Sequence, residues 1–183
     1  MPQRRTIGWK DIQFNQTNIE MAEQFWKDSF AGLEAAQYPS IPIGYQPTLS
    51  RIVEHEIRGL DWSALNDESH SISTKLSASW ALLLAQYANT EDVVFGRSVS
   101  DIEVAHDSSP LCIRDYTFPL RVQVDWTSTL RKWLQDIQSQ ATGMEALHDP
   151  GCLDRIRLCS PQAQKACDFS TILVVQDATL DEV

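Results

Sequence analysis

The sequence predicts an α/β fold in which a mixed sheet is covered by helices. Two observations support this prediction. Several segments repeat apolar residues at the spacing of an amphipathic helix, and short runs rich in β-branched residues lie between them. Because helical and extended segments alternate along the chain, a layered α/β arrangement is expected.

The predicted helices end at recognisable sequence signals. The helix that begins near residue 72 has Ser71 or Ser73 as its predicted N-cap. Asp149-Pro-Gly151 ends the predicted helix 128–147. The second half of the segment 72–87 is apolar nearly all round, so we expect neighbours to cover it on more than one side. The predicted helices span residues 20–35, 72–87, 128–147 and 161–166.

The predicted strands differ in their expected burial. Residues 51–59 alternate loosely, which indicates a partly exposed strand, whereas 169–175 is apolar on both faces and is predicted to be a central strand. The predicted strands span residues 51–59, 93–99, 118–124 and 169–175. The intervening residues 38–47, 60–70 and 100–112 are expected to form irregular connections.

Charge and length narrow the class of protein. The 183 residues fit a single domain, and 15 Lys and Arg against 25 Asp and Glu give a net charge of −10. Such a surface repels phosphate backbones and anionic lipid headgroups, which disfavours nucleic-acid and membrane partners. No apolar run is long enough to span a membrane and no export signal is visible, so a cytoplasmic location is expected.

Common catalytic signatures are absent from the sequence. It contains no GxSxG elbow, no Walker loop, no GxGxxG and no histidine or cysteine spacing typical of a metal site. His106-Asp107 and His148-Asp149 pair an imidazole with a carboxylate, but solvated loop and helix-end positions explain both pairs more simply. We expect Cys152 and Cys159 to be idle thiols, and the helical tryptophans (Trp26, Trp80, Trp133) to pack in the core.

Five segments in register carry a resemblance to a known family. They are FWKDSFAGLEA (25–35), STKLSASWALLLAQYANTEDVVFG (73–96), TFPLRV (117–122), LDRIR (153–157) and ACDFSTILVVQ (166–176). In this order they resemble the second, C-terminal lobe of the condensation domains of fungal non-ribosomal peptide synthetases. The resemblance divides the chain into a lead-in (1–19), a partial lobe (20–176) and an acidic, truncated end (177–183).

The resemblance implies a fold and a reaction. Condensation domains have two lobes related to chloramphenicol acetyltransferase, and they form an amide bond between acyl groups tethered to carrier proteins by phosphopantetheine. No cofactor or metal bound directly to the chain is implied. The family motif His-His-x-x-x-Asp-Gly, which belongs to the first lobe, is absent here. The crossover also departs from the family, because Cys112 replaces a glycine, Arg114 and Asp115 add charge, and the loop 101–109 is short.

Three hypotheses follow. The chain is an incomplete condensation domain that is inactive alone, or an interaction module for a carrier protein or a complementary half-domain, or an enzyme in which His106 or His148 replaces the lost base. We expect marginal stability or self-association through an exposed inter-lobe face. No catalytic residue is assigned. If a wall of the family's acyl tunnel is present, the candidates are Ser98, Ser100, Thr117 and Arg121.

Overall fold

A computed structural model describes residues 16–35, 37–42, 44–46, 48, 51–59, 69–103, 112–147 and 152–176, with the side chains of 16–18, 100–103 and 112–115 left out. The described helices are α1 (Gln16–Ser29), α3 (Ile72–Ala88), α4 (Leu130–Ala146), α5 (Cys152–Cys159) and α6 (Pro161–Ala166). The described strands are β1 (Asp92–Glu103), β2 (Cys112–Gln123) and β3 (Ile172–Val174).

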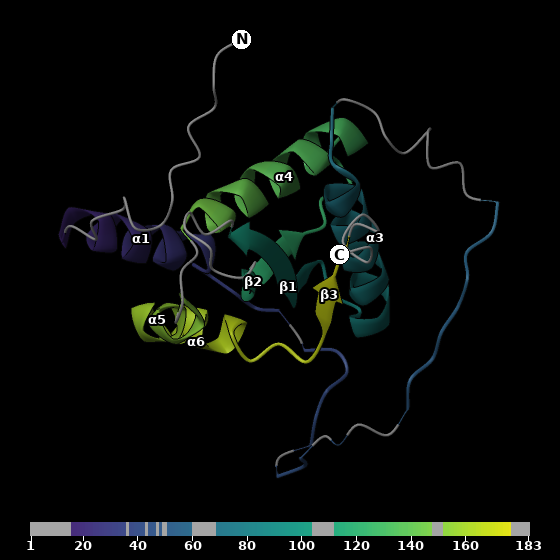
Figure 1. Ribbon diagram of the computed structural model, residues 1–183, viewed down its shortest axis with the longest axis horizontal. Helices are drawn as coiled ribbons and strands as arrows, with labels where there is room; N and C mark the ends of the chain where they lie inside the picture. Colours follow the sequence, from purple (N-terminus) through teal and green to yellow (C-terminus); the bar gives the residue numbers. More distant parts are fainter. Residues whose placement is uncertain are drawn as a thin grey trace.

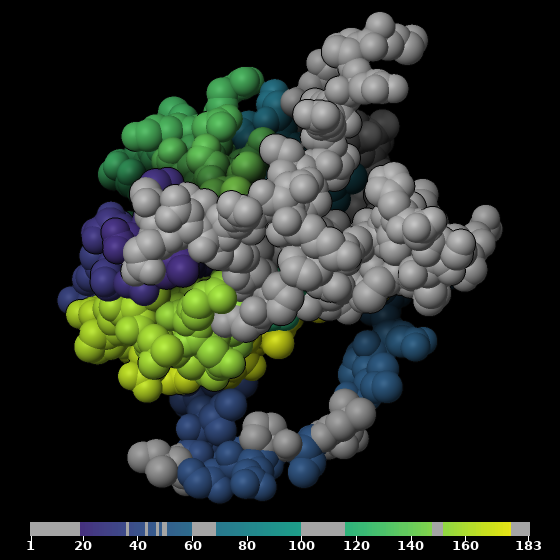
Figure 2. Space-filling model, turned by 60° about the vertical axis from the view of Figure 1, so that its left-hand side comes forward, coloured from purple at the N-terminus to yellow at the C-terminus, as the bar shows by residue number. Residues whose placement is uncertain are grey.

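The three strands form one mixed sheet in the order β2-β1-β3. β1 pairs antiparallel with β2 and parallel with β3. α4 and the pair α5–α6 lie on opposite sides of this sheet, and α3 lies beside β1 (Figure 1). α1 lies between α4 and α5–α6, as the purple band between the green and yellow-green helices shows (Figure 2). The predicted mixed sheet with helical cover is therefore confirmed.

The helix ends follow from local sequence. Ser71 is the N-cap of α3, and its side chain accepts a hydrogen bond from the backbone N–H of Thr74 at 3.1 Å. At the other end Asn89 adopts the left-handed conformation, with φ 50°, which ends the helix. Thr129 and Ser160 cap α4 and α6 in the same way as Ser71. Ser71 is thus confirmed as one of the two predicted caps, and the short predicted helix 161–166 is also confirmed.

Large apolar side chains from every layer meet in one core. Trp26 stacks on Phe30 with ring centroids 6.1 Å apart, and Trp133 donates its indole N–H to the backbone oxygen of Gln123 at 2.9 Å. Trp26 and Trp133 are buried as predicted, while Trp80 is half-buried. The largest fully buried apolar side chains are Phe30, Phe95, Phe118, Leu120, Met144 and Ile156.

Two predictions about strands are wrong. Residues 51–59 form no strand and lie exposed along a long excursion from the body (Figure 2). An alternating pattern produces a strand only where a second backbone is present to pair with it, and none of the described segments pairs here. β3 is an edge of the described sheet and not its centre, and its side chains Ile172 and Val174 are 54% and 53% exposed.

Helix and loop expectations also need correction. The outer face of α3 is only partly covered within the described residues, because Leu83 and Tyr87 are 41% and 64% exposed even though the Tyr87 ring lies 5.4 Å from that of Tyr38. Both described ends of the polar segment 100–112 are strand, because residues 100–103 belong to β1 and Cys112 begins β2. Ladder hydrogen bonds join backbones whatever the side chains are. α5 was not predicted as a helix. No helix of the described residues is long and apolar enough to cross a membrane.

A glycine in β1 permits the closest packing in the sheet. A Cβ at Gly96 would lie 2.5 Å from the Phe169 ring, so the ring rests directly on the backbone of β1. Gly96 also donates its N–H to the backbone oxygen of Thr171 at 2.8 Å, which begins the pairing with β3. The Phe169 ring and β3 are therefore held by the same position of β1.

We predict that Gly96→Ala lowers the free energy of unfolding by about 1–3 kcal/mol, because the ring of Phe169 must move. Chemical denaturation measures this change. The double variant Gly96→Ala/Phe169→Leu should recover part of the loss relative to Phe169→Leu alone. A Cβ at Gly143 meets only the edge of Phe25 at 3.2 Å, so Gly143→Ala is the control and should be near neutral. Equal losses at both glycines would contradict this account.

Candidate functional site

Two of the suspected tunnel residues form part of a row across the sheet. Ser98 of β1 lies opposite Thr117 of β2 and opposite Val174 of β3. Residues paired in this way share a face, so Thr117, Ser98 and Val174 point to the same side. Ser98 and Thr117 are half-buried and Val174 is exposed. We refer to these three residues as the hydroxyl row.

The structure does not place the other two candidates in the hydroxyl row. Ser100 lies two residues further along β1, and its side chain lies outside the described residues. Arg121 shares the face of the hydroxyl row, but it pairs with Val94, and the pair Gly96–Pro119 separates it from Ser98 and Thr117. Because the Phe169 ring rests on Gly96, it stands between the two groups. Arg121 therefore does not cluster with Ser98 and Thr117, and the role of all four candidates in a tunnel stays a prediction.

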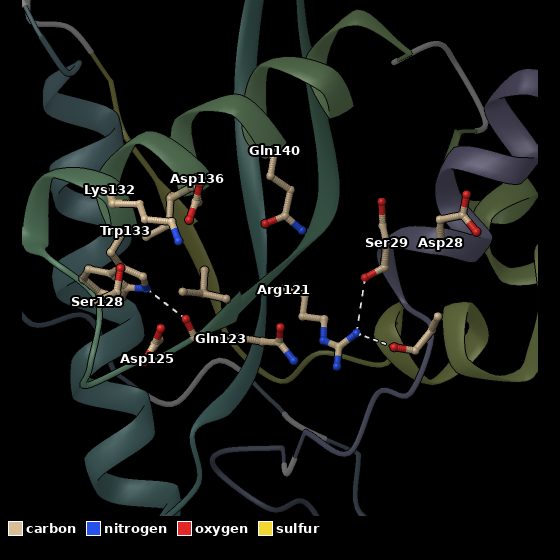
Figure 3. A pocket seen from close by; sticks show the side chains of 13 residues that line it. Asp28, Ser29, Arg121, Gln123, Asp125, Ser128, Lys132, Trp133, Asp136 and Gln140 are labelled. Carbon is tan, nitrogen blue, oxygen red and sulfur yellow. Dashed lines mark hydrogen bonds between the residues drawn. The ribbon is translucent and has the colours of Figure 1, made fainter.

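Arg121 is engaged in a buried network that joins the sheet to α1. Its Nε and Nη2 donate to the two carboxylate oxygens of Asp92 at 2.8 and 2.9 Å. Nη1 donates to the backbone oxygen of Ala31 at 2.7 Å and, as Figure 3 shows, to that of Ser29, at 3.4 Å. Nη2 also donates to the backbone oxygen of Gly32 at 3.2 Å. These carbonyls belong to the last residue of α1 and to the turn that follows it, where a helix has no partners of its own for its C=O groups.

The network satisfies both charges. Arg121 is 8% exposed, and Asp92 also accepts the backbone N–H of Glu34 at 3.0 Å. The guanidinium of an arginine has five N–H donors and can reach carboxylate and carbonyl acceptors on several sides at once, which the ammonium of a lysine cannot. Arg121 therefore caps and positions the end of α1. The sequence offered no sign of this role, because Asp92 is 29 residues away from Arg121.

A polar pocket of about 520 Å³ opens beside Arg121, between the end of α1, the end of β2 and α4. Figure 3 shows Asp136 and Gln140 of α4 directed toward it, opposite Arg121 and Gln123. Its lining includes neither histidine nor cysteine, so it holds no imidazole base and no thiol nucleophile. The residues of the hydroxyl row do not line it. The described lining presents carboxylates, amides and an ammonium, which suit the pocket to binding a polar group.

Acidic side chains dominate the charge of this pocket. Asp28, Asp125 and Asp136 contribute carboxylates, and Lys132 contributes an ammonium. Hydrogen bonds from the hydroxyl and backbone N–H of Thr127, at 2.6 and 2.9 Å, lower the pKa of Asp125 below its usual range. Asp125 is therefore ionised at neutral pH, and the pocket is a poor place for an anion.

The remaining candidates for catalysis divide between described and undescribed residues. His106-Asp107 and His148-Asp149 lie outside the described residues. His55 is exposed on the segment 51–59, and His70 is buried just before α3. The described part of the chain contains no group of His, Cys, Asp or Glu that could hold a metal ion.

The described cysteines lie in environments that disfavour the reactive thiolate. Burial raises the pKa of the Cys167 thiol to about 12, and burial also raises the pKa of Cys159. Cys152 is buried and its Sγ lies 4.0 Å from the backbone oxygen of Leu147. The expectation of idle thiols agrees with these environments.

We predict that Cys152 and Cys167 resist alkylation by iodoacetamide near neutral pH, and that Cys159, which is only partly buried, reacts slowly. The thiolate is the nucleophile, and burial suppresses it. Peptide mass spectrometry with and without denaturant measures the modification at each site. Modification of Cys167 in the folded protein as fast as in denaturant would contradict the prediction.

We predict that Arg121→Met lowers the free energy of unfolding by about 3–5 kcal/mol, because Asp92 and the end of α1 lose their buried partner. Arg121→Lys should recover little, since one ammonium cannot reach both Asp92 and the carbonyls. The matched control is Arg58→Met, which removes an arginine whose ion pair with Glu56 is 83% and 71% exposed, and its loss should stay below about 0.5 kcal/mol. Urea denaturation compares the variants, and equal losses at the two arginines would contradict the assigned role.

Comparisons with known proteins agree with the resemblance found in the sequence. The chain is 35% identical over 159 residues to nonribosomal peptide synthetase ungA' of Aspergillus campestris, which is 85% of this chain and 2% of that protein. It is 32% identical over 176 residues to nonribosomal peptide synthetase 30 of Fusarium vanettenii, covering 94% of this chain and 3% of the relative. The chain thus spans a few per cent of the length of these relatives. No family model matches it.

Solved structures share the fold. The crystal structure of "CT" matches 85% of this chain and 34% of its own, with a TM-score of 0.57 and 23% identity. The crystal structure of "holo T3CT" matches 88% of this chain and 35% of its own, with a TM-score of 0.53. The predicted fold class, that of one lobe of a chloramphenicol-acetyltransferase-like fold, is confirmed. The predicted resemblance to part of a fungal non-ribosomal peptide synthetase is confirmed as well.

Proposed function

We propose that the chain acts as the second lobe of a condensation domain in non-ribosomal peptide synthesis, and that it is inactive without a first lobe. This proposal rests on the fold match, which covers 85% of this chain and about a third of the matched CT chain. The sequence also lacks the motif His-His-x-x-x-Asp-Gly. Amide-bond formation then needs a base that another polypeptide segment supplies.

The hydroxyl row gives this lobe a part in the reaction. No histidine occurs in β1, β2 or β3, so the described sheet offers walls and hydrogen-bonding groups but no imidazole base. The half-buried hydroxyls of Ser98 and Thr117 are suited to bonding the amide groups of a carrier's phosphopantetheine arm. We assign that arm, and a carrier protein in the cytoplasm, as the ligand and partner of the proposed lobe.

A second function is supported by the exposed edge of the sheet. Ile172 and Val174 are more than half exposed, and an apolar edge strand is a place where another chain can pair. This favours a non-catalytic module that binds a carrier protein, a complementary half-domain or a second copy of itself. The catalytic and the binding hypotheses are distinguished by whether product forms when a first lobe is added.

The test is an acyl-transfer assay with a loaded carrier pair and a synthetic acceptor amine. We expect no product with this chain alone and product when a separately expressed first lobe is added. Ser98→Phe, which fills the hydroxyl row, should lower turnover of the reconstituted pair by at least about tenfold. Ser79→Phe on the exposed face of α3 is the matched control and should leave turnover unchanged.

Each result decides between the functions. Turnover by the chain alone contradicts the proposal and returns attention to His106 and His148. If no product forms with the added lobe, while an intact condensation domain is active on the same substrates, the binding module is favoured. An equal effect of Ser98→Phe and Ser79→Phe would remove the hydroxyl row from the site.

A further inference from the structure

A second buried arginine lies on the face of the sheet opposite Arg121. Arg97 of β1 is enclosed between the start of α3 and the end of α4. Its Nη2 donates to the hydroxyl of Ser73 at 2.9 Å and lies 2.9 Å from a carboxylate oxygen of Glu145. The Arg97 side chain is 8% exposed, whereas that of Glu145 is 35% exposed. Solvent therefore reaches the cluster from the side of Glu145.

The guanidinium of Arg97 is not fully satisfied. Its Nη1 is buried and has no hydrogen-bond acceptor among the residues that the structure describes. A buried donor without an acceptor is rare in native proteins, and it points to a bound water, ion or ligand. Burial lowers the pKa of Arg97 and the charge of Glu145 only opposes this effect. One carboxylate thus compensates the buried cation incompletely.

The first turn of α3 adds positive potential at the same place. Ser73, which accepts the bond from Arg97, is the second residue of this 17-residue helix. The N-terminus of a helix carries a partial positive charge and free backbone N–H groups. Ser71 caps Thr74, but the first turn contains no acidic residue. A buried, partly unpaired guanidinium and a helix N-terminus therefore converge.

We propose that Arg97 Nη1 and the first turn of α3 bind a small oxyanion, a phosphate or a carboxylate. Both groups present acceptor oxygens to a guanidinium and to helix N–H groups. Glu145 holds Nη2 and leaves Nη1 for the ligand. This site is separate from the hydroxyl row and from the acidic pocket, and it does not depend on the proposed function.

The test is thermal unfolding of the full chain in phosphate, acetate or chloride at equal ionic strength and neutral pH. When phosphate or acetate reaches about ten times its Kd, linkage predicts a rise in Tm of roughly 3–6 °C over chloride. Arg97→Gln should abolish this rise. Arg131→Gln removes an arginine from the exposed surface of α4 and should retain it.

Two further variants keep the proposal testable if Arg97→Gln does not fold. Ser73→Asp places a carboxylate in the first turn of α3 and should remove the response to both anions. Glu145→Gln removes the competing negative charge and should lower the Kd of the anion several-fold. A response to phosphate alone or to acetate alone supports the site and identifies the ligand class. No rise in either anion, or the same rise in every variant, overturns the proposal.

Discussion

The fold depends most on the buried pair of Arg121 and Asp92. Asp92 begins β1 and Arg121 lies near the end of β2, so the pair fixes the register at the end of the antiparallel ladder. The same guanidinium reaches the carbonyls that follow α1, and the same carboxylate holds the backbone N–H of Glu34. A desolvated ion pair is tolerated only where its remaining donors and acceptors are satisfied. Satisfying them requires α1 to end where it does, and so places Trp26 and Phe30 in the core.

The two buried arginines show how the number of acceptors separates a structural role from a binding role. Both side chains leave the same pair of strands, one toward each face of the sheet, and both are at most about a tenth exposed. Arg121 meets two carboxylate oxygens and three carbonyls, which uses its whole fork. Arg97 meets one hydroxyl and one carboxylate through Nη2 and leaves Nη1 unmatched among the described residues. The matched arginine stabilises the fold, and the unmatched one has capacity for a ligand.

Local signals in the sequence predicted the local structure well. Ser71 before an apolar run predicts the start of α3, because an N-cap acts within one turn. The strand status of 51–59 and the edge position of β3 depend on which backbones lie beside them, and the pattern of one segment carries no such information. The same limit applies to the site. Ser98 and Thr117 were suspected separately, but their common face follows from the register, and the engagement of Arg121 follows from a residue far along the chain.

The hydroxyl row and the open edge of the sheet are one feature and not two. Val174 belongs to the row, and it is also the exposed residue of the edge strand. A strand that paired with β3 would lie beside Val174, and its side chains would extend the face of the sheet that carries Ser98 and Thr117. A partner at the edge would therefore bind next to the proposed site, so the catalytic and the binding hypotheses use the same face of the sheet.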